Sequence, residues 1–195
     1  MVTGTVSSEQ GAAMALADYI QSKPTIETER LRLRPMAASD VPALREWMAD
    51  RSIYTYWGKG PSRTDKDPAL MFEKPERLTK SLHLGIEERD SGKVVGELWV
   101  YLIVNDRMAT VAIRLAPSRQ GMGYGTEALS AVARFCFEHT ELQRLCAEVD
   151  VRNVASWRML EKCGFVREGM VRQGKMVNTW CDYYLYGLLR SDVAG

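Results

Sequence analysis

The sequence predicts one α/β domain built on a mixed, mostly antiparallel central sheet that is flanked by helices. Three strand-like runs, at 82–88, 94–104 and 108–115, follow one another through short turns, and turns of this length join antiparallel strands. After Pro117 the pattern changes to helices and strands in alternation, which places some strands parallel within the same sheet. The middle run, 94–104, is apolar on both faces and is therefore expected at the buried centre of the sheet.

The length supports a single domain, because 195 residues can bury one sizeable core. Residues 1–25 are small and polar, with a weak helical stretch at 8–20, and we expect an N-terminal extension that could dock as a helix. The domain itself is expected over 26–190, and 191–195 would be a short tail.

The first half of the domain combines one strand and one helix with an irregular region. Strict alternation at 30–34 predicts a strand that stops at Pro35. Ser39 and Asp40 predict the cap of a helix with apolar positions every three or four residues, at Val41, Leu44, Trp47 and Met48. Residues 51–81 show no clear period and are expected to be part-helical, a type of segment that often contacts substrate.

The second half alternates helices and strands. An apolar stripe predicts a helix over 126–139, formed by Ala128, Leu129, Val132, Phe135 and Cys136. Strands are expected at 145–151, 165–171 and 182–188, and a shorter helix at 153–163. Gly164 follows that helix at the position where a left-handed residue commonly ends a helix.

Charge and hydropathy argue against several classes of partner. The net charge of +1 gives no reason to expect DNA or a membrane surface. The longest apolar run, 98–104, is too short to cross a bilayer, and no basic region precedes the N-terminal apolar patch as in a signal peptide. We therefore expect a cytoplasmic protein.

The cysteines and histidines show neither a metal-binding nor a disulfide pattern. No CxxC pair occurs among the four cysteines, which are Cys136, Cys146, Cys163 and Cys181. His83 and His139 are isolated from each other and from the cysteines. Buried free thiols and no metal site are expected.

The stretch 119–126, Arg-Gln-Gly-Met-Gly-Tyr-Gly-Thr, lies between a predicted strand and a predicted helix. Its glycines let backbone N–H groups point into one concavity, and the helix N-terminus adds a partial positive charge, so a bound phosphate is favoured. Arg119 would add a charge-assisted contact to a phosphate oxygen. Neither a P-loop nor a G-x-G-x-x-G motif fits, since no Gly-Lys-Ser/Thr follows and Thr126 stands at the third glycine position. The stretch therefore predicts a pyrophosphate cradle.

At these residues the chain resembles the GNAT acetyltransferase superfamily, whose cofactor signature is matched by Gln120, Gly123 and Gly125. The resemblance covers residues 25–190 and is closest to the branch that acetylates ribosomal-protein N-termini, the RimJ/RimL-like type. It rests on four further stretches, at 28–35, 125–129, 153–156 and 161–169.

The resemblance implies the GNAT fold, acetyl-CoA as co-substrate and acetyl transfer to a primary amine. The strand at 112–116 should splay from the strand at 145–151, leaving a wedge in which pantetheine pairs with the backbone of Ile113 and Leu115. Asn153 would hold pantetheine or nearby backbone. The cradle residues implied to bind the cofactor are Arg119, Gln120, Gly121, Met122, Gly123, Tyr124, Gly125 and Thr126.

Two residues are candidates for proton transfer. By the resemblance, Ser156 stands where a hydroxyl can reach the departing sulfur; the alternative is a first-turn residue that satisfies helix N–H groups. Many relatives carry an acidic residue at the position of Thr110, and a threonine cannot act as a general base. Glu97 is then the first candidate base, because burial in the most apolar strand favours proton uptake, with an arginine-paired glutamate as the alternative. Glu148 and Asp150 are second choices.

The acceptor is expected to be a peptide N-terminus or a small-molecule amine. An α-amine, with a pKa of about 8, is partly neutral at physiological pH, whereas a lysine amine, at about 10.4, needs more help from a base. The missing glutamate therefore favours an α-amine. The irregular region is expected to supply the acceptor wall, unless its aromatic rings only pack a lid onto the sheet. The wall residues would be Tyr54, Tyr56, Trp57, Lys59 and Arg63.

The expected mechanism is direct attack of a neutral amine on the thioester, because no cysteine has the paired base that an acyl-cysteine route would need. Two other functions stay open, namely a non-catalytic module that binds acyl-CoA and a dinucleotide-binding oxidoreductase. The oligomeric state, monomer or homodimer, stays open as well.

Overall fold

The computed structural model describes residues 15–22, 24–73, 81–104 and 107–193. Its strands form one eight-stranded sheet in the order β1-β2-β3-β4-β5-β6-β8-β7. The strands are β1 Ile26–Glu27, β2 Leu31–Arg34, β3 Leu82–Glu88, β4 Val94–Val104, β5 Met108–Leu115, β6 Arg144–Asp150, β7 Val166–Met176 and β8 Thr179–Leu189. Among these described strands only β5 and β6 pair in parallel, so the predicted mixed, mostly antiparallel sheet is confirmed.

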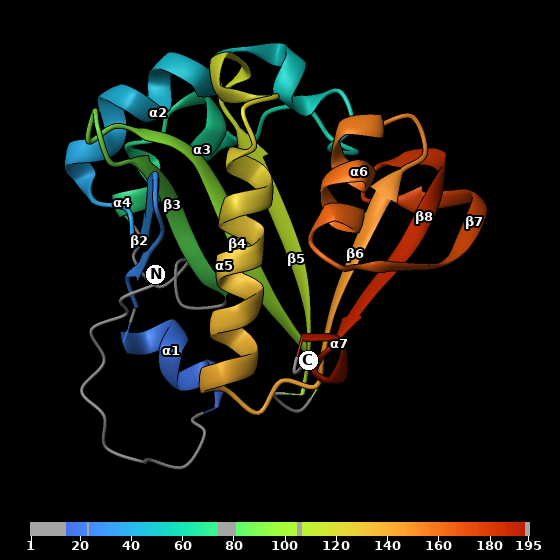
Figure 1. Ribbon diagram of the computed structural model, residues 1–195. Coiled ribbons are helices and arrows are strands. Elements are labelled where there is room, and N and C mark those ends of the chain that lie inside the picture. The colour runs from blue at the N-terminus through green and yellow to red at the C-terminus, as the bar shows by residue number, and fades with distance from the viewer. Residues whose placement is uncertain (1–14, 23, 74–80, 105–106, 194–195) are drawn as a thin grey trace.

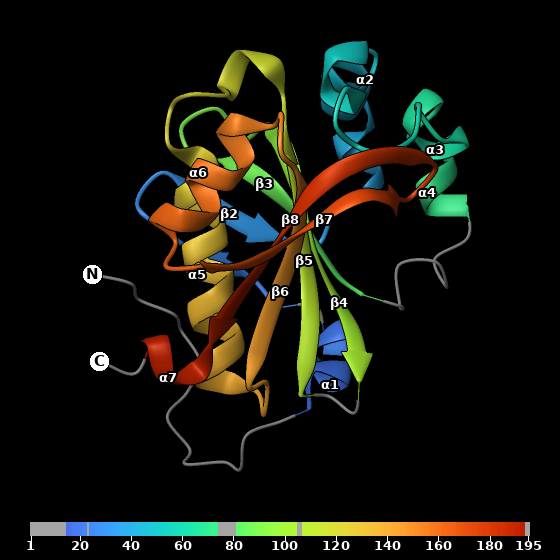
Figure 2. The ribbon, with the colours of Figure 1, turned by 90° about the vertical axis from the view of Figure 1, so that its right-hand side faces the viewer.

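Helices cover both faces of the sheet. They are α1 Leu16–Ser22, α2 Val41–Met48, α3 Arg63–Lys66, α4 Leu70–Glu73, α5 Tyr124–His139, α6 Val154–Lys162 and α7 Arg190–Val193, with 3-10 turns at Ala38–Asp40, Arg51–Tyr54 and Pro117–Arg119. The long helix α5 crosses the front of the sheet in Figure 1. Figure 2 shows α5 and α6 on one side of the strands and α2, α3 and α4 on the other. None of the described helices is long and apolar enough to span a membrane.

The three central strands agree with their predicted bounds and divide their side chains between two faces. Strands β3, β4 and β5 form an antiparallel meander with β4 in the middle. Leu98 and Val100 of β4 lie in the main core with the apolar stripe of α5. Glu97 and Trp99, on the alternate positions of the same strand, face the side of the short helices.

Strand β6 leaves β5 early, as the resemblance implied. The parallel pairing runs only over Met108↔Arg144, Ala109↔Leu145 and Thr110↔Cys146. Beyond Thr110, β5 stays paired with β4 and β6 stays paired with β8. A wedge therefore opens between β5 and β6 one residue before the expected start at 112.

Helix α1 packs on the domain core. Leu16 and Ile20 are 0% and 5% exposed and belong to the main apolar cluster. Tyr19 meets the ring of Phe135 on α5 edge-on, with 5.0 Å between ring centroids. The segment expected to be helical at 8–20 is thus helical from Leu16, while 8–14 lies outside the described residues. The division of the chain at residue 25 remains a prediction.

Three local predictions differ from the structure. Helix α5 begins at Tyr124 because Gly123, with φ of 84°, is the residue before it. Asp40 stands at the N-cap of α2, but its carboxylate accepts hydrogen bonds from Arg34 at 2.8 Å and makes no cap bond. Strands β7 and β8 form a longer hairpin than expected. The prediction was too short because β7 is a mostly exposed edge strand with two irregular registers, so its sequence lacks the alternation of buried and exposed residues that indicates a strand.

The four cysteines are free thiols, as expected. Cys136 and Cys181 are buried, whereas Cys146 and Cys163 are only half-buried. Burial raises the pKa of the Cys136 thiol to about 12, which keeps it protonated and unreactive.

Leu16→Ala tests the contribution of α1. The substitution removes a fully buried side chain and leaves a cavity, so we expect the free energy of unfolding to fall by about 2–5 kcal/mol. Asp18→Ala is the control on the same helix, since Asp18 is exposed and its loss should change stability by about 0.5 kcal/mol or less. Denaturant unfolding measures both variants, and equal stability of the two would show that α1 is dispensable to the core.

Candidate active site

The wedge exposes unpaired backbone in the middle of the sheet. The N–H of Ala116 donates to the carbonyl oxygen of Val95 at 2.8 Å, so every second residue of β5 turns its polar groups towards β4. Ile113 and Leu115 occupy the other positions and turn their backbone N–H and carbonyl groups towards the wedge. The side-chain amide of Gln120 donates to the carbonyl oxygen of Leu115 at 3.1 Å, which confirms that this oxygen is free of β4. An amide-containing chain can pair with this edge as a strand would.

The predicted cradle lies at the start of α5. Gly121 and Gly123 have φ of 74° and 84°, values that favour glycine, and a side chain at Gly121 would meet no atom within 4 Å. In the part of the chain that the structure describes, no hydrogen bond joins the N–H groups of residues 121–126 to a protein acceptor. These N–H groups and the positive end of a 16-residue helix together suit a phosphate.

Arg119 is held by a carboxylate beside the cradle. Its Nε donates to Glu88 Oε1 at 3.0 Å, and the hydroxyl of Tyr124 donates to the same oxygen at 2.8 Å. Hydrogen bonds from Arg119, Ser91 and Tyr124 lower the pKa of Glu88 to about 2. The Arg119 side chain is 34% exposed, so it remains accessible to a ligand although it is already paired.

Arg30 is a second cation at the cradle, and sequence reasoning missed it. Its Nη1 donates to the carbonyl oxygen of Met122 at 3.0 Å and its Nε to Glu127 Oε2 at 2.7 Å. Its guanidinium carbon lies 4.7 Å from the centre of the Tyr124 ring. The sequence placed Arg30 and Glu127 in two separate family stretches, but nothing in a single sequence showed that they meet.

Other cradle residues differ in their surroundings. A side chain at Gly125 would meet Sδ of Met159 at 2.7 Å, so this glycine allows α5 to pack closely against α6. Met122 is 50% exposed, whereas Thr126 is half-buried.

Asn153 and Ser156 lie at the start of α6, directly after β6. The Asn153 side chain caps the helix by accepting the N–H of Ser156 at 3.3 Å. The capping role considered for Ser156 is therefore filled by Asn153, which leaves the Ser156 hydroxyl available for other contacts. Ser156 is half-buried.

An open pocket of about 200 Å³ lies on the face of the sheet opposite α5. Its walls come from β3, β4 and β5, from α3 and α4, and from the loop before α3. The lining residues are Trp57, Lys59, Ser62, Thr64, Asp65, Met71, His83, Glu97, Trp99, Tyr101 and Arg114. It lies where the sequence predicts the acceptor wall, and Trp57 and Lys59 are among its lining residues.

The other predicted wall residues lie apart from the pocket. Tyr54 is buried, and its hydroxyl donates to the carbonyl oxygen of Met48 at 3.0 Å. Burial raises the pKa of Tyr54 to about 12. Tyr56 is exposed, with the guanidinium of Arg152 over its ring. Tyr54 thus packs as part of the lid, the alternative left open by the sequence, and Arg63 is not among the lining residues.

The candidate bases are engaged in contacts. Glu97 is 0% exposed; Oε1 accepts from Arg114 Nε at 2.5 Å and Oε2 lies 2.8 Å from His83 Nε2. This geometry matches the alternative of an arginine-paired glutamate. Asp150 is bound by Arg152 at 2.9 Å, and Glu148 is exposed. Thr110, at the last paired position before the wedge, donates its hydroxyl to the carbonyl oxygen of Cys146 at 3.2 Å.

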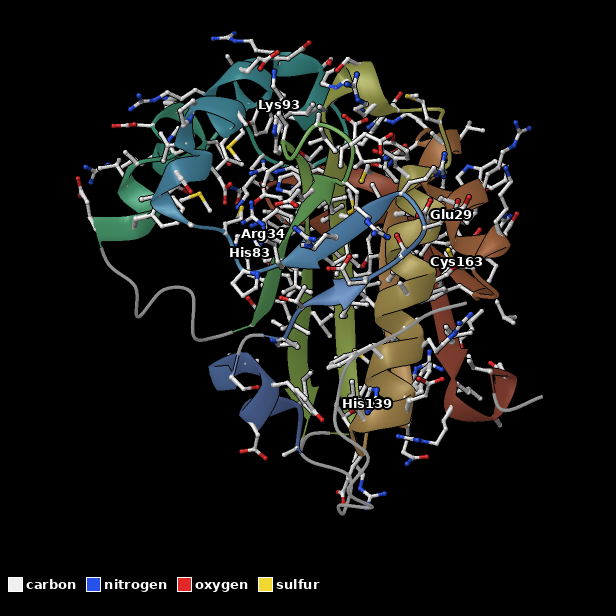
Figure 3. The ribbon with its side chains drawn as sticks, turned by 60° about the vertical axis from the view of Figure 1, so that its left-hand side comes forward. Glu29, Arg34, His83, Lys93, His139 and Cys163 are labelled. Atoms are coloured by element: carbon white, nitrogen blue, oxygen red, sulfur yellow. The ribbon has the colours of Figure 1, made fainter. Side chains whose placement is uncertain are left out.

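His83 is the pocket residue that sequence reasoning overlooked. Its ring stacks on Trp99 with centroids 4.6 Å apart, and Figure 3 shows it on the sheet side facing the short helices, far from His139 and Cys163. The alternation of residues at 82–86 could have placed His83 on the pocket face of the sheet, since it stands between apolar residues that point into the core. Among the described residues, no three His, Cys, Asp or Glu side chains gather in a way that could hold a metal ion.

Comparison with known proteins identifies the family. Residues 30–166 match the model of the family described as Acetyltransferase (GNAT) domain. The chain belongs to the GNAT acetyltransferases. It is therefore an acetyl-CoA-dependent N-acetyltransferase, and the oxidoreductase and the non-catalytic module are set aside.

Several known proteins are similar to this chain over most of its length. The chain is 26% identical to the uncharacterized N-acetyltransferase YnaD of Bacillus subtilis over 86% of this chain and 98% of that protein. It is 26% identical to a spermidine N(1)-acetyltransferase of Vibrio cholerae over 76% and 86%. A ribosomal-protein-S5-alanine acetyltransferase of Vibrio fischeri superposes with a TM-score of 0.72 at 21% identity, covering 86% of this chain and 97% of that one. At this identity the last similarity shows the fold alone.

Gly123→Val tests the cradle. A valine resists φ of 84°, and its Cβ would lie 3.3 Å from Arg30 Nη2 in the space offered to phosphate. We expect acetyl-CoA to raise the melting temperature of the unaltered protein and to leave that of Gly123→Val unchanged, because ligand binding to the native state alone stabilises it.

Gly92→Val is the matched control for this experiment. Gly92 has φ of 66° in the turn between β3 and β4 and meets no atom within 4 Å, so the variant carries the same backbone strain away from the cradle. A full acetyl-CoA shift in Gly123→Val would show that the pyrophosphate binds elsewhere.

Proposed function

We propose that the acceptor is a primary amine of the α-amine type, in the first place the N-terminus of a peptide or protein, bound in the pocket over β4 and β5. The observation that carries this proposal is that every carboxylate oxygen lining the pocket already accepts a hydrogen bond. Asp65 is engaged by Arg114 and by the N–H of Ser62, and Glu97 by Arg114 and His83. A second ammonium group of a polyamine would therefore have to compete with these contacts for the lining carboxylates.

The charges of the pocket support the same choice. The lining carries two acidic side chains, Asp65 and Glu97, and besides His83 two basic ones, Lys59 and Arg114, so acidic and basic side chains are balanced. A polyamine with several positive charges gains little from such a wall. The aromatic rings of Trp57 and Trp99 offer apolar contact to the first side chains of a peptide.

Relatives of both kinds are known. A putative ribosomal-protein-serine acetyltransferase of Vibrio cholerae, 26% identical and covering 85% of this chain, supports assignment to the RimJ/RimL-like branch, and the spermidine acetyltransferase of Vibrio cholerae supports the polyamine alternative. The composition of the pocket is the reason that we favour the α-amine.

The cofactor contacts follow from the wedge and the cradle. Ile113 and Leu115 would pair with the amides of pantetheine, and Gly121 to Thr126 would hold the pyrophosphate through backbone N–H groups. Ser156 would donate its proton to the sulfur as the C–S bond breaks and would regain a proton from water. The new C–N bond forms by attack of the neutral amine on the thioester carbonyl, and the amine proton leaves to water. On this proposal Glu97 holds Arg114 in place and does not act as the base.

A panel of acceptors tests the proposal. With acetyl-CoA held constant, peptides with a free N-terminus should be acetylated with a higher kcat/KM than spermidine, and mass spectrometry of the products should place the acetyl group on the α-amine. Peptides with a blocked N-terminus and a free lysine are the control. Preferential acetylation of spermidine would overturn the proposal.

The pH profile tests the absence of a dedicated base. We expect kcat/KM to rise through the pKa of the acceptor itself, about 8 for an α-amine, because only the neutral amine attacks. Glu97→Gln should keep the shape of this profile, as should Glu148→Gln, an exposed control. Ser156→Ala should lower kcat by less than the roughly 10²-fold that loss of a general base costs, since a thiol with a pKa of about 8.5 is a tolerable leaving group. A lower pKa that disappears in Glu97→Gln would identify Glu97 as the base.

A further inference from the structure

Arg114 occupies the centre of a box made of acids and aromatic rings. Its side chain is 7% exposed and pairs with Asp65 of α3 and Glu97 of β4. Four rings surround the guanidinium carbon at 5.4 to 5.7 Å from their centres, and they belong to Trp47, Tyr54, Trp57 and Trp99. The acceptor pocket borders this box, because Arg114, both acids, Trp57 and Trp99 also line the pocket.

Such a box has the composition of a site for an organic cation. Aromatic faces attract ammonium and guanidinium groups, and desolvated carboxylates add charge-assisted hydrogen bonds. Here the cation belongs to the protein itself. Burial alone would raise the pKa of Asp65, but the hydrogen bond and charge of Arg114 outweigh burial and hold that pKa below its usual value. The cation of Arg114 is therefore well matched to its surroundings.

Resting on the proposed function, we propose that Arg114 is the specificity-determining residue of the acceptor pocket. It fills the position at which a second amino group of a polyamine would bind, and its removal would uncover a cation site formed by Glu97, Asp65 and the aromatic box. Arg114 also ties α3 to the sheet, so the wall that carries Asp65 is fixed in place by the same residue that excludes cations.

Arg114→Met tests the inference by a measurement that needs no turnover. Methionine fills much of the space and packs well against aromatic rings, but it leaves two buried carboxylates without their cation. We expect the variant to melt at a lower temperature than the unaltered protein, and spermidine or methylguanidinium to restore much of the loss. The unaltered protein should show no such response at equal ionic strength.

Arg34→Met is the matched control. Arg34 also bridges two carboxylates, at 2.5 Å from Glu87 and 2.8 Å from Asp40, but it is not among the residues that line the pocket. This variant should lose stability without gaining acetylation of spermidine. In Arg114→Met, the ratio of kcat/KM for spermidine to that for a peptide α-amine should rise about tenfold or more, the factor that one strong charge contact supplies.

A second variant covers the case in which Arg114→Met does not fold. Arg114→Met combined with Asp65→Asn leaves Glu97 as the one carboxyl group of the box, and Glu97 keeps its contact with His83. This double variant should still be stabilised by methylguanidinium. A variant that folds only when spermidine or methylguanidinium is present counts as responding. The inference is overturned if neither variant responds to either cation. If the unaltered enzyme acetylates no peptide amine, the proposed acceptor fails, but the response of Arg114→Met to cations still decides the role of Arg114.

Discussion

The separation of β6 from β5 after Thr110 is the constraint on which the active site depends. Unpaired backbone in the middle of a sheet is normally costly, because each N–H and carbonyl group gives up a hydrogen bond. The chain tolerates it here because each strand keeps a partner on its other side, β4 for β5 and β8 for β6. On the side of this opening, the backbone of Ile113 and Leu115 is therefore not paired with a neighbouring strand. The cradle at α5 and the start of α6 lie at the same end of the two strands, so one gap in the sheet organises the whole site (Figure 1).

The same strands build both the core and the acceptor pocket, because their side chains alternate between two faces. Leu98 and Val100 face α5, whereas Glu97 and Trp99 face the pocket. A shift of β4 by one residue would therefore place a glutamate in the core and a leucine in the pocket. The large apolar area buried under α5 fixes the register, and the register fixes the position of every pocket residue on β3, β4 and β5. The hairpin of β7 and β8 contacts the loop before α3 from far along the sequence, since the N–H of Asn178 donates to the carbonyl oxygen of Gly58 at 3.0 Å, and Figure 2 shows the hairpin reaching towards α3.

The sequence predicted those features that local patterns encode. The meander of β3, β4 and β5 follows from turns and apolar runs, the stripe of α5 from its helical period, and the cradle from glycines that precede a helix. The contacts among charged side chains were not predictable, because they join residues far apart in the chain. Arg30 meets Glu127, and Arg114 joins Asp65 to Glu97, only after the strands and helices have assembled. The hairpin of β7 and β8 was underestimated for a different reason, since an exposed edge strand does not need the alternation from which strands are recognised.

The ion pairs around the site show how this chain can bind an anionic co-substrate while its net charge is only +1. Arg30 and Arg119, the two cations beside the cradle, are each matched by a carboxylate, Glu127 and Glu88. The cradle therefore presents little net side-chain charge, and attraction for phosphate has to come from oriented backbone N–H groups and the start of α5. The pairs still matter, because they hold the loop: Arg30 binds the carbonyl oxygen of Met122, and Glu88 binds the hydroxyl of Tyr124. Positioning by paired charges and recognition by backbone dipoles are thus separate tasks at this site, and they are assigned to different atoms. The pocket over β4 and β5 shows the same division, since Arg114 and its two acids fix the wall while the rings of Trp57 and Trp99 line the open space.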